Sequence, residues 1–194
     1  MGKGNELFPV FLKLESLKTL IVGGGKTGLE KLDAILKNSP AAQVILVAPV
    51  ISREIKDRVR NLRTVTLQER NFLARDLTGK DLVLLATSDR ALHKRIRGAS
   101  RKRGILVNVA DTPDLCDFYL GSVVTKGDLK IGISTNGKSP TITKRLREYL
   151  EDAIPDATQQ ILDNMAAIRD RIKGDLPTKV KVLNEVTSSW LKKG

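Results

Sequence analysis

The 194-residue sequence is poor in cysteine, histidine and aromatic residues. Its single cysteine, Cys116, excludes a disulfide framework within one chain and a zinc site made of Cys-x-x-Cys pairs. Only 4% of the residues are aromatic, which leaves little material for stacking on nucleic-acid bases. The low cysteine content favours a reducing, cytoplasmic location.

Long apolar segments and targeting signals are also missing. No run approaches the roughly 20 apolar residues that span a bilayer, and the mixed N-terminus MGKGNELFPVFLKL does not have the pattern of a signal peptide. The hydrophobic fraction of 41% is nevertheless enough for a sizeable core. We therefore expect a soluble protein of one ordinary domain, or of one domain plus a small appendage, with no membrane partner.

The net charge of +12 at pH 7 is unevenly distributed. Residues 1–138 hold 24 Lys/Arg against 14 Asp/Glu, an excess of +10, whereas residues 139–194 hold 10 against 8, an excess of +2. Such an excess attracts acidic partners. Because aromatic residues are few, the composition favours a polyanionic small molecule over nucleic acid.

Apolar runs alternate with amphipathic segments over the first 110 residues. The pattern predicts strands at 18–22, 43–48, 64–69, 81–87 and 105–110, and helices at 26–38, 52–62 and 90–103. This alternation indicates an α/β fold with a Rossmann-like parallel sheet and right-handed crossovers.

The pattern changes after Asp111. Two β-like runs, 118–125 and 129–134, flank Lys126-Gly127-Asp128 and predict an antiparallel hairpin. Ser139 and Pro140 then provide the N-cap and first turn of a helix to about residue 153. Further helices are expected over 156–173 and 178–192. The predicted domains are therefore a Rossmann-like domain (1–112), a small β segment with its helix (113–150) and a helical C-terminal tail (151–194).

A glycine turn follows the first predicted strand and opens the first helix. It satisfies the pattern G-x-G-x-x-G from Gly23 to Gly28, in the context that a dinucleotide-binding turn requires. Glycines let the backbone approach a pyrophosphate, and the helix N-terminus offers it unpaired N–H groups. The alternative is a purely structural turn. The acidic residue that often ends the second strand is absent, since Ala48-Pro49-Val50 stands there, so this position does not distinguish NAD from NADP.

Polar residues follow the fourth and fifth predicted strands. Thr87 and Ser88 follow the fourth, and Asn108 and Asp111 close the fifth. Ligands of open α/β sheets bind outside the carboxyl ends of the strands. Asp111 is therefore a candidate proton acceptor. The alternative is that it caps a turn before Pro113.

Other polar side chains are weaker candidates. His93 is expected to be solvated on the 90–103 helix, whose seven Lys and Arg residues form either a solvated face or a surface that attracts an acidic ligand. Cys116 is a lone thiol with no histidine nearby to activate it as a nucleophile, but it can line a site. Lys138 and Lys144 belong to a second basic group around the N-terminus of the Ser139 helix, where a carboxylate is favoured.

Several motifs occur together in a recognisable order. They are the Leu7–Phe11 segment, VGGG, VAP at 47–49, ATSD at 86–89, GILVNVAD at 104–111, DLCDF at 114–118 and ISTNGKSP followed by TITKRLREYLE at 133–151. Over about residues 5–155 this combination resembles the siroheme synthase N-terminal family. That family comprises precorrin-2 dehydrogenases, some of which are also sirohydrochlorin ferrochelatases.

The resemblance implies NAD-dependent oxidation of precorrin-2 to sirohydrochlorin, with Fe²⁺ as a second substrate in bifunctional members. It also implies a homodimer in which the middle β segment and its helix exchange contacts. By correspondence with the family's motifs, Asp111 is implied as the catalytic residue. The implied cofactor-binding residues are Gly23, Gly24, Gly25, Lys26, Thr27, Pro49, Val50, Thr87, Ser88 and Asn108. The implied substrate-binding residues are Cys116, Thr135, Lys138, Ser139 and Lys144.

The sequence departs mildly from the family pattern. Ser88 stands where an acid is usual, Asn136 replaces a glycine, and Lys144 replaces an arginine. Two other functions are weighed against the enzyme. A nucleotide-sensing regulatory domain of a potassium transport system shares the glycine turn but usually has the acid that is missing here. A nucleic-acid binder is supported by charge alone.

Overall fold

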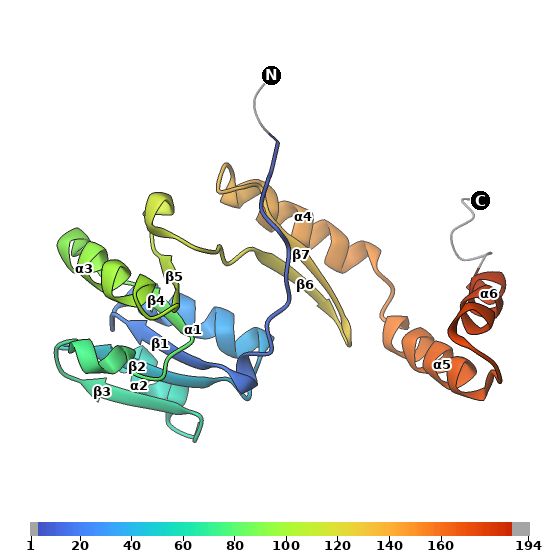
Figure 1. Ribbon diagram of the computed structural model, residues 1–194, viewed down its shortest axis with the longest axis horizontal. Helices are drawn as coiled ribbons and strands as arrows, with labels where there is room; N and C mark the ends of the chain where they lie inside the picture. The colour runs from blue at the N-terminus through green and yellow to red at the C-terminus, as the bar shows by residue number, and fades with distance from the viewer. Residues whose placement is uncertain (1–3, 188–194) are drawn as a thin grey trace. The chain divides into compact units, whose positions relative to one another are not determined.

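A computed structural model describes residues 4–187. The chain forms two compact units (Figure 1). One consists of residues Phe8–Leu120, and the described part of the other consists of residues 4–7 and 121–187.

The Phe8–Leu120 unit is built on a five-stranded parallel sheet. Its strand order is β3-β2-β1-β4-β5, in which the chain reverses direction across the sheet after β3. The strands are β1 (Lys18–Val22), β2 (Gln43–Ala48), β3 (Val65–Glu69), β4 (Leu82–Leu85) and β5 (Leu106–Val109). β1 lies between β2 and β4, with Ile21 opposite Leu46 on one side and Leu84 on the other. This is the predicted Rossmann-like sheet.

Helices cover both faces of the sheet. On one face, α1 (Lys26–Asn38) and α2 (Arg53–Val59) pack on alternate strand residues such as Ile21 and Leu46. On the other, α3 (Arg90–Arg101) and the 3-10 helix η2 (Ala74–Leu77) pack on residues such as Leu20 and Val83. Successive residues of a strand therefore enter different cores, which explains why the strands read as continuous apolar runs.

The other unit contains the predicted hairpin and helices. β6 (Ser122–Lys126) pairs antiparallel with β7 (Leu129–Ile133), and α4 (Pro140–Ala153) packs against this hairpin. The helices α5 (Thr158–Arg171) and α6 (Leu176–Thr187) follow and contact each other. The Gln159 side chain on α5 exchanges hydrogen bonds with Asp128 in the hairpin turn, which fixes that turn to the tail.

Most predicted elements are found with shorter ends. The Phe118–Thr125 run begins as a strand only at Ser122, because Phe118 and its neighbours lie along β5 instead. The predicted Ser139 cap is confirmed, since its hydroxyl accepts a hydrogen bond from the Ile142 N–H. The last predicted helix extends beyond the described residues, to 192.

The expectation that His93 is solvated is wrong. Its side chain is only 3% exposed. His93, Ile96 and Ser100 are the buried residues of α3, and their spacing of three and four residues puts them on one helix face. The charged neighbours of His93 occupy the other faces, which is why composition alone misplaced it.

Within residues 4–187, no helix combines the length and apolar character needed to cross a membrane.

Candidate active site

The glycine turn joins β1 to α1 where there is no room for side chains. A Cβ atom on Gly23 would lie 2.3 Å from the Ala86 carbonyl oxygen, and one on Gly24 would lie 2.2 Å from the Val50 carbonyl oxygen. Gly23 also has a φ of 131°, which side chains rarely permit. The turn therefore brings three strand ends together closely.

The N-terminus of α1 is arranged differently from those of its neighbours. No side chain caps it, and its N-cap residue is Gly25. By contrast, Ser52 caps α2 and Asp89 caps α3. A Cβ on Gly25 would meet no protein atom within 4 Å. The space before this helix end is thus open to a ligand, and uncapped N–H groups there favour an anion such as a pyrophosphate.

Lys26 and Thr27 occupy the first turn of α1, where Lys26 is exposed and Thr27 half-buried. They are therefore accessible beside the open helix end. This arrangement fits the phosphate part of a dinucleotide.

The loop after β2 is held without an acidic residue of its own. Pro49 and Val50 are exposed. The Ile51 N–H donates to the Glu69 carboxylate at the end of β3, at 3.0 Å. The Lys56 ammonium donates to both oxygens of the same carboxylate, which holds the pKa of Glu69 below its usual range. Glu69 therefore fixes the backbone of this loop.

Thr87 and Ser88 follow β4 beside the glycine turn. The Thr87 hydroxyl lies 2.8 Å from Nε2 of His93, and Ser88 is exposed. Burial lowers the pKa of His93, although the Asp89 charge and a hydrogen bond with the Thr87 backbone oppose this shift. The imidazole beside Thr87 is therefore kept neutral at physiological pH.

Asn108 links β5 to α1. Its side chain is 3% exposed, and its Oδ1 accepts a hydrogen bond from the Lys31 ammonium at 3.0 Å. Its Nδ2 donates to the Phe118 carbonyl at 2.8 Å. Both ends of the amide are thus engaged inside the protein, which makes Asn108 an organising residue of this edge of the sheet.

Lys31 is the main cation near this edge. Burial lowers its pKa, while the charges of Cys116, Asp111 and Glu30 oppose the shift. Within the described part of the chain, no salt bridge joins Lys31 to a carboxylate. Its charge is therefore only partly compensated.

Cys116 lies against β5. Its Sγ accepts a hydrogen bond from the Val109 N–H and donates one to the Val109 carbonyl, both at 3.2 Å. Burial raises the pKa of the thiol. A protonated thiol is a poor nucleophile, so these contacts favour a packing role at the edge of the site.

Asp111 follows β5 by two residues and is exposed. Its φ of 53° lies in the left-handed region, which is uncommon for residues other than glycine. Among residues 4–187 its carboxylate has no hydrogen-bond or ion-pair partner. The capping alternative is thus not what the structure shows, and the carboxylate is available to a ligand.

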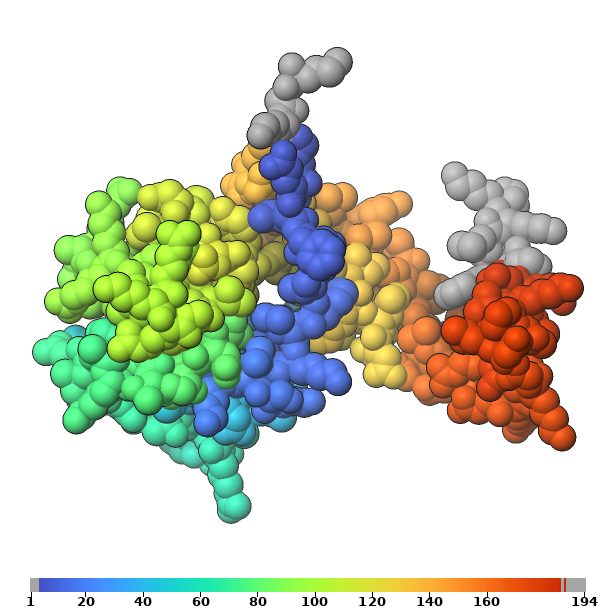
Figure 2. Space-filling model, in the orientation of Figure 1, coloured from blue at the N-terminus to red at the C-terminus, as the bar shows by residue number. Residues whose placement is uncertain are grey.

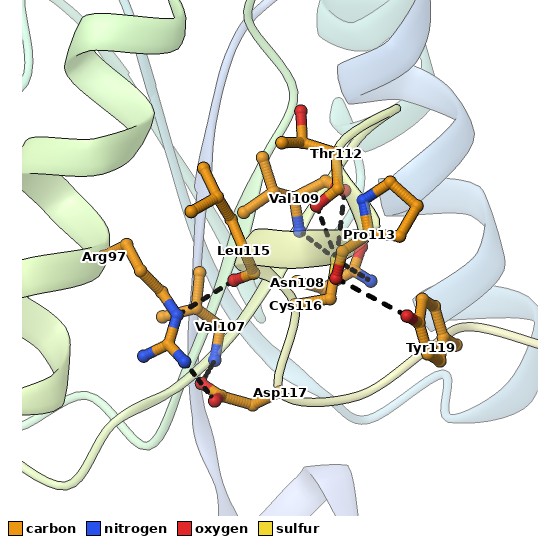
Figure 3. Close-up of polar contacts among 10 residues, drawn as sticks. All are labelled: Arg97, Val107, Asn108, Val109, Thr112, Pro113, Leu115, Cys116, Asp117 and Tyr119. Carbon is orange, nitrogen blue, oxygen red and sulfur yellow. Dashed lines mark hydrogen bonds and ion pairs between the residues drawn. The ribbon is translucent and has the colours of Figure 1, made fainter. Parts of the chain in front are cut away.

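The DLCDF segment, which follows Asp111 in the chain, is anchored by Arg97 of α3 (Figure 3). The Arg97 guanidinium donates to the Leu115 carbonyl at 2.9 Å and forms an ion pair with Asp117. The other Asp117 oxygen accepts from the Val107 N–H at 3.0 Å. Arg97 therefore does not belong to a solvated basic face. Figure 2 shows α3 and the segment after β5, in green to yellow-green, at the surface.

The four remaining predicted substrate residues lie at the start of α4, in the other unit. Ser139 caps the helix, and its backbone exchanges hydrogen bonds with the Thr135 hydroxyl at 3.1 and 3.3 Å. Lys138 is exposed, and Lys144 is an exposed residue 3.9 Å from Glu148. They form a local basic group at a helix N-terminus.

The Phe8–Leu120 unit therefore gathers the predicted cofactor residues, Cys116 and Asp111 at the carboxyl ends of its strands. Sequence reasoning missed Lys31 and Glu69 and misplaced His93. Lys31 lies next to the apolar stripe of α1, but nothing in its spacing showed that it would reach Asn108. No group of three or more His, Cys, Asp or Glu side chains suited to a metal ion occurs among residues 4–187.

Two family profiles match the chain. One, described as "Putative NAD(P)-binding", matches residues 10–122, and one described as "Sirohaem biosynthesis protein central" matches residues 126–153. Among curated relatives, siroheme synthase of Methylococcus capsulatus is 35% identical over 89% of this chain and 36% of its own length. Siroheme synthase of Psychrobacter cryohalolentis is 36% identical over 94% of this chain and 34% of its own length. The chain thus spans about a third of these relatives.

A solved structure, "SirC, precorrin-2 dehydrogenase", is similar to most of this chain. Its TM-score is 0.73 at 26% sequence identity, covering 93% of this chain and 89% of that protein. The first profile covers more than half of the 194 residues. The chain therefore belongs to the family described as "Putative NAD(P)-binding", and the second profile, the siroheme synthases and the SirC structure support the predicted siroheme synthase N-terminal family.

Proposed function

We propose that this protein is an NAD-dependent dehydrogenase that oxidises precorrin-2 to sirohydrochlorin. The observation that carries the proposal is the similarity to SirC, precorrin-2 dehydrogenase, along nearly the full length of both chains. The siroheme synthase relatives support the same pathway. They also favour it over the nucleotide-sensing function of a transport system.

The cofactor residues fit a dinucleotide. The uncapped N-terminus of α1 and the open space at Gly25 suit the pyrophosphate. Pro49 and Val50 are exposed and suit contacts with the adenosine part of the dinucleotide. Thr87 and Ser88, which follow β4, suit contacts with the rest of the dinucleotide. Both polar atoms of the Asn108 amide already form hydrogen bonds within the protein. We therefore propose that Asn108 supports the cofactor site from the protein interior. Bound NAD⁺ supplies the hydride acceptor.

Asp111 is the proposed base. Oxidation removes a hydride and a proton from the substrate, and a free carboxylate at the end of β5 is suited to take the proton. Asp111 combines a left-handed backbone with an exposed position, so it is accessible to a substrate. The basic character of the chain, +12 at pH 7, favours a polycarboxylate substrate.

We further propose that Thr135, Lys138, Ser139 and Lys144 bind substrate carboxylates, and, separately, that Cys116 of the Phe8–Leu120 unit contacts the substrate. The support for the first four is the basic group at the N-terminus of α4. Replacing Lys138 by Met should raise KM for the tetrapyrrole and leave the affinity for NAD⁺ unchanged. Lys173→Met, which removes a lysine beyond α5, is the matched control.

An anaerobic assay with precorrin-2 tests the activity. NADH formation, with conversion of precorrin-2 to sirohydrochlorin, supports the proposal, and its absence from folded protein that binds NAD⁺ refutes it. NADP⁺ is compared in parallel, because the end of β2 has no acidic residue to read the ribose. A reducing buffer matches the proposed cytoplasmic location. Co-purification with a membrane transporter would favour the regulatory alternative instead.

Fe²⁺ insertion is proposed as a second reaction at the same carboxylate. Its support is the relatives named siroheme synthase, since insertion requires a base for the pyrrole protons that leave. Sirohydrochlorin and Fe²⁺ are incubated without NAD⁺ and the siroheme spectrum is followed. A rate equal to that without protein would exclude this reaction and leave the dehydrogenase intact.

A homodimer formed through the hairpin and α4 is proposed as the assembly. α4 exposes three large apolar side chains one turn apart: Ile142 (53%), Leu146 (43%) and Tyr149 (69%). An apolar stripe on a helix whose other side already packs on β6 favours burial against a partner. Light scattering tests this: Leu146→Glu should yield monomers, whereas Lys144→Glu, on the polar side, should not.

A further inference from the structure

The Thr87–His93 pair joins the end of β4 to the interior of α3. Thr87 Oγ1 and His93 Nε2 are 2.8 Å apart. Thr87 directly follows Ala86, whose carbonyl oxygen packs against Gly23 of the glycine turn. Thr87 is a half-buried residue, so it is not sealed inside the protein. His93 thus contacts a side chain at the cofactor edge without being exposed itself.

The environment of the imidazole decides which nitrogen carries the proton. Nδ1 of His93 is buried and has no hydrogen-bond partner among residues 4–187. A neutral imidazole has one N–H donor and one bare acceptor nitrogen. A proton on Nδ1 would leave a buried donor without an acceptor, which folded proteins rarely tolerate. The proton therefore belongs on Nε2, which donates it to Thr87.

This assignment fixes the direction of the Thr87 hydroxyl. Because Oγ1 accepts from the imidazole, its own hydrogen remains available for another acceptor. Bound dinucleotides offer phosphate and ribose oxygens as acceptors. If the imidazole were the acceptor instead, the Thr87 hydroxyl would donate its hydrogen to His93. It could then only accept hydrogen bonds from a ligand.

We propose that His93 is a positioning residue for cofactor binding, which makes Thr87 a hydrogen-bond donor to an oxygen of the dinucleotide. The inference rests on the proposed function, since it requires a dinucleotide at the glycine turn. It assigns a role to the single histidine of the chain and predicts the protonated nitrogen before any ligand is bound.

The first test needs no ligand. Since the protein has one histidine, a long-range ¹H–¹⁵N correlation spectrum of the labelled protein near pH 8 contains one imidazole. We expect Nε2 to be protonated and Nδ1 to be bare. A proton on Nδ1 would overturn the proposal, whatever the protein binds.

The second test measures NAD⁺ affinity by calorimetry. Thr87→Val removes the hydroxyl, and His93→Phe keeps a ring but removes the donor. Each should weaken binding by about 3- to 10-fold, the value of one ordinary hydrogen bond. The double variant should be no weaker than Thr87→Val alone, because both changes remove the same interaction. His93→Gln, whose amide nitrogen can replace Nε2, should restore much of the affinity.

The outcomes separate the two proposals. Wild-type protein that binds NAD⁺ while the His93 and Thr87 variants bind equally well refutes the positioning role and leaves the dehydrogenase proposal standing. Additive losses in the double variant would likewise refute the coupling. If folded wild-type protein binds neither NAD⁺ nor NADP⁺, the dehydrogenase proposal fails, and the donor role of Thr87 fails with it. Far-UV circular dichroism of each variant verifies folding.

Discussion

The Lys31 ammonium on α1 donates a hydrogen bond to the Asn108 side chain on β5, with Nζ and Oδ1 3.0 Å apart. The contact joins the helix that begins at the glycine turn to the strand that leads to Asp111. The other end of the Asn108 amide holds the Phe118 carbonyl. One side chain of α1 thus helps to organise the segment around the proposed base.

Replacing Lys31 by Met should change how stability depends on pH. Burial lowers the pKa of Lys31 from its ordinary value of 10.5 in the folded protein. Between the folded and unfolded pKa values the unfolded chain binds more protons, so the free energy of unfolding rises with pH in that window. Urea unfolding from about pH 8 up to the ordinary lysine pKa of 10.5 should therefore show a smaller rise in the free energy of unfolding for Lys31→Met.

Lys37 provides the matched control, since it lies on the same helix but is exposed. Lys37→Met should show the same dependence of unfolding free energy on pH as the wild-type protein. Equal slopes for all three proteins would show that burial of Lys31 has no effect on its protonation.

Gly24 and Gly25 are neighbours with opposite surroundings, so alanine at each should have a different effect. At Gly25 the added Cβ meets no protein atom within 4 Å. Gly25→Ala should therefore fold normally, yet bind NAD⁺ more weakly because the methyl group occupies the space of the ligand. Thermal shifts with and without NAD⁺ measure both quantities, since a ligand stabilises only the protein that binds it.

Gly24→Ala is the reverse case. Its Cβ would lie 2.2 Å from the Val50 carbonyl oxygen, and such overpacking costs about 1–3 kcal/mol. The free energy of unfolding should fall even without ligand. A Gly25→Ala protein with unchanged affinity for NAD⁺ would argue against a ligand at the N-terminus of α1.

The strands and the glycine turn were predictable because their determinants are local. Lys18–Val22 and Lys26–Asn38 have the residue ranges that the apolar periodicity predicts. The surroundings of Asn108 were not predictable, because Lys31 and Phe118 reach it from 77 residues before and 10 residues after. His93 shows the same limit. Its burial depends on which side of α3 packs against the sheet, whereas its charged neighbours in the sequence suggested that it would be solvated.

Asp111→Asn should abolish most of the oxidation while preserving the cofactor site. An amide has nearly the shape of the carboxylate but cannot accept a proton at neutral pH. General bases contribute about 10²- to 10⁴-fold to rate, so kcat should fall by at least about a hundredfold with NAD⁺ affinity unchanged. The assay is NADH formation from precorrin-2 in the absence of oxygen.

Asp114 is the control for Asp111, because it is also exposed and lies three residues further along, 3.6 Å from Arg90. Asp114→Asn should retain activity, since exposed ion pairs contribute little. If Asp111→Asn were as active as Asp114→Asn, the proton would have to leave to another group. If iron insertion were lost together with oxidation in Asp111→Asn, one carboxylate would serve both reactions.

The buried imidazole of His93 should make the protein less stable in mild acid. Burial lowers the pKa of His93 from its ordinary 6.5, against the opposing charge of Asp89. As the pH falls from 6.5 to the folded pKa, the unfolded chain takes up a proton that the folded protein does not, and the free energy of unfolding decreases. Above pH 6.5 this contribution is fully present.

His93→Gln cannot titrate. Between about pH 7.5 and pH 5.5, urea unfolding should therefore show a smaller loss of unfolding free energy for this variant than for the wild-type protein. The carboxylates titrate in both proteins and cancel in the comparison. Equal losses would mean that His93 takes up its proton as readily in the folded state as in the unfolded chain, which a side chain buried behind Thr87 should not do.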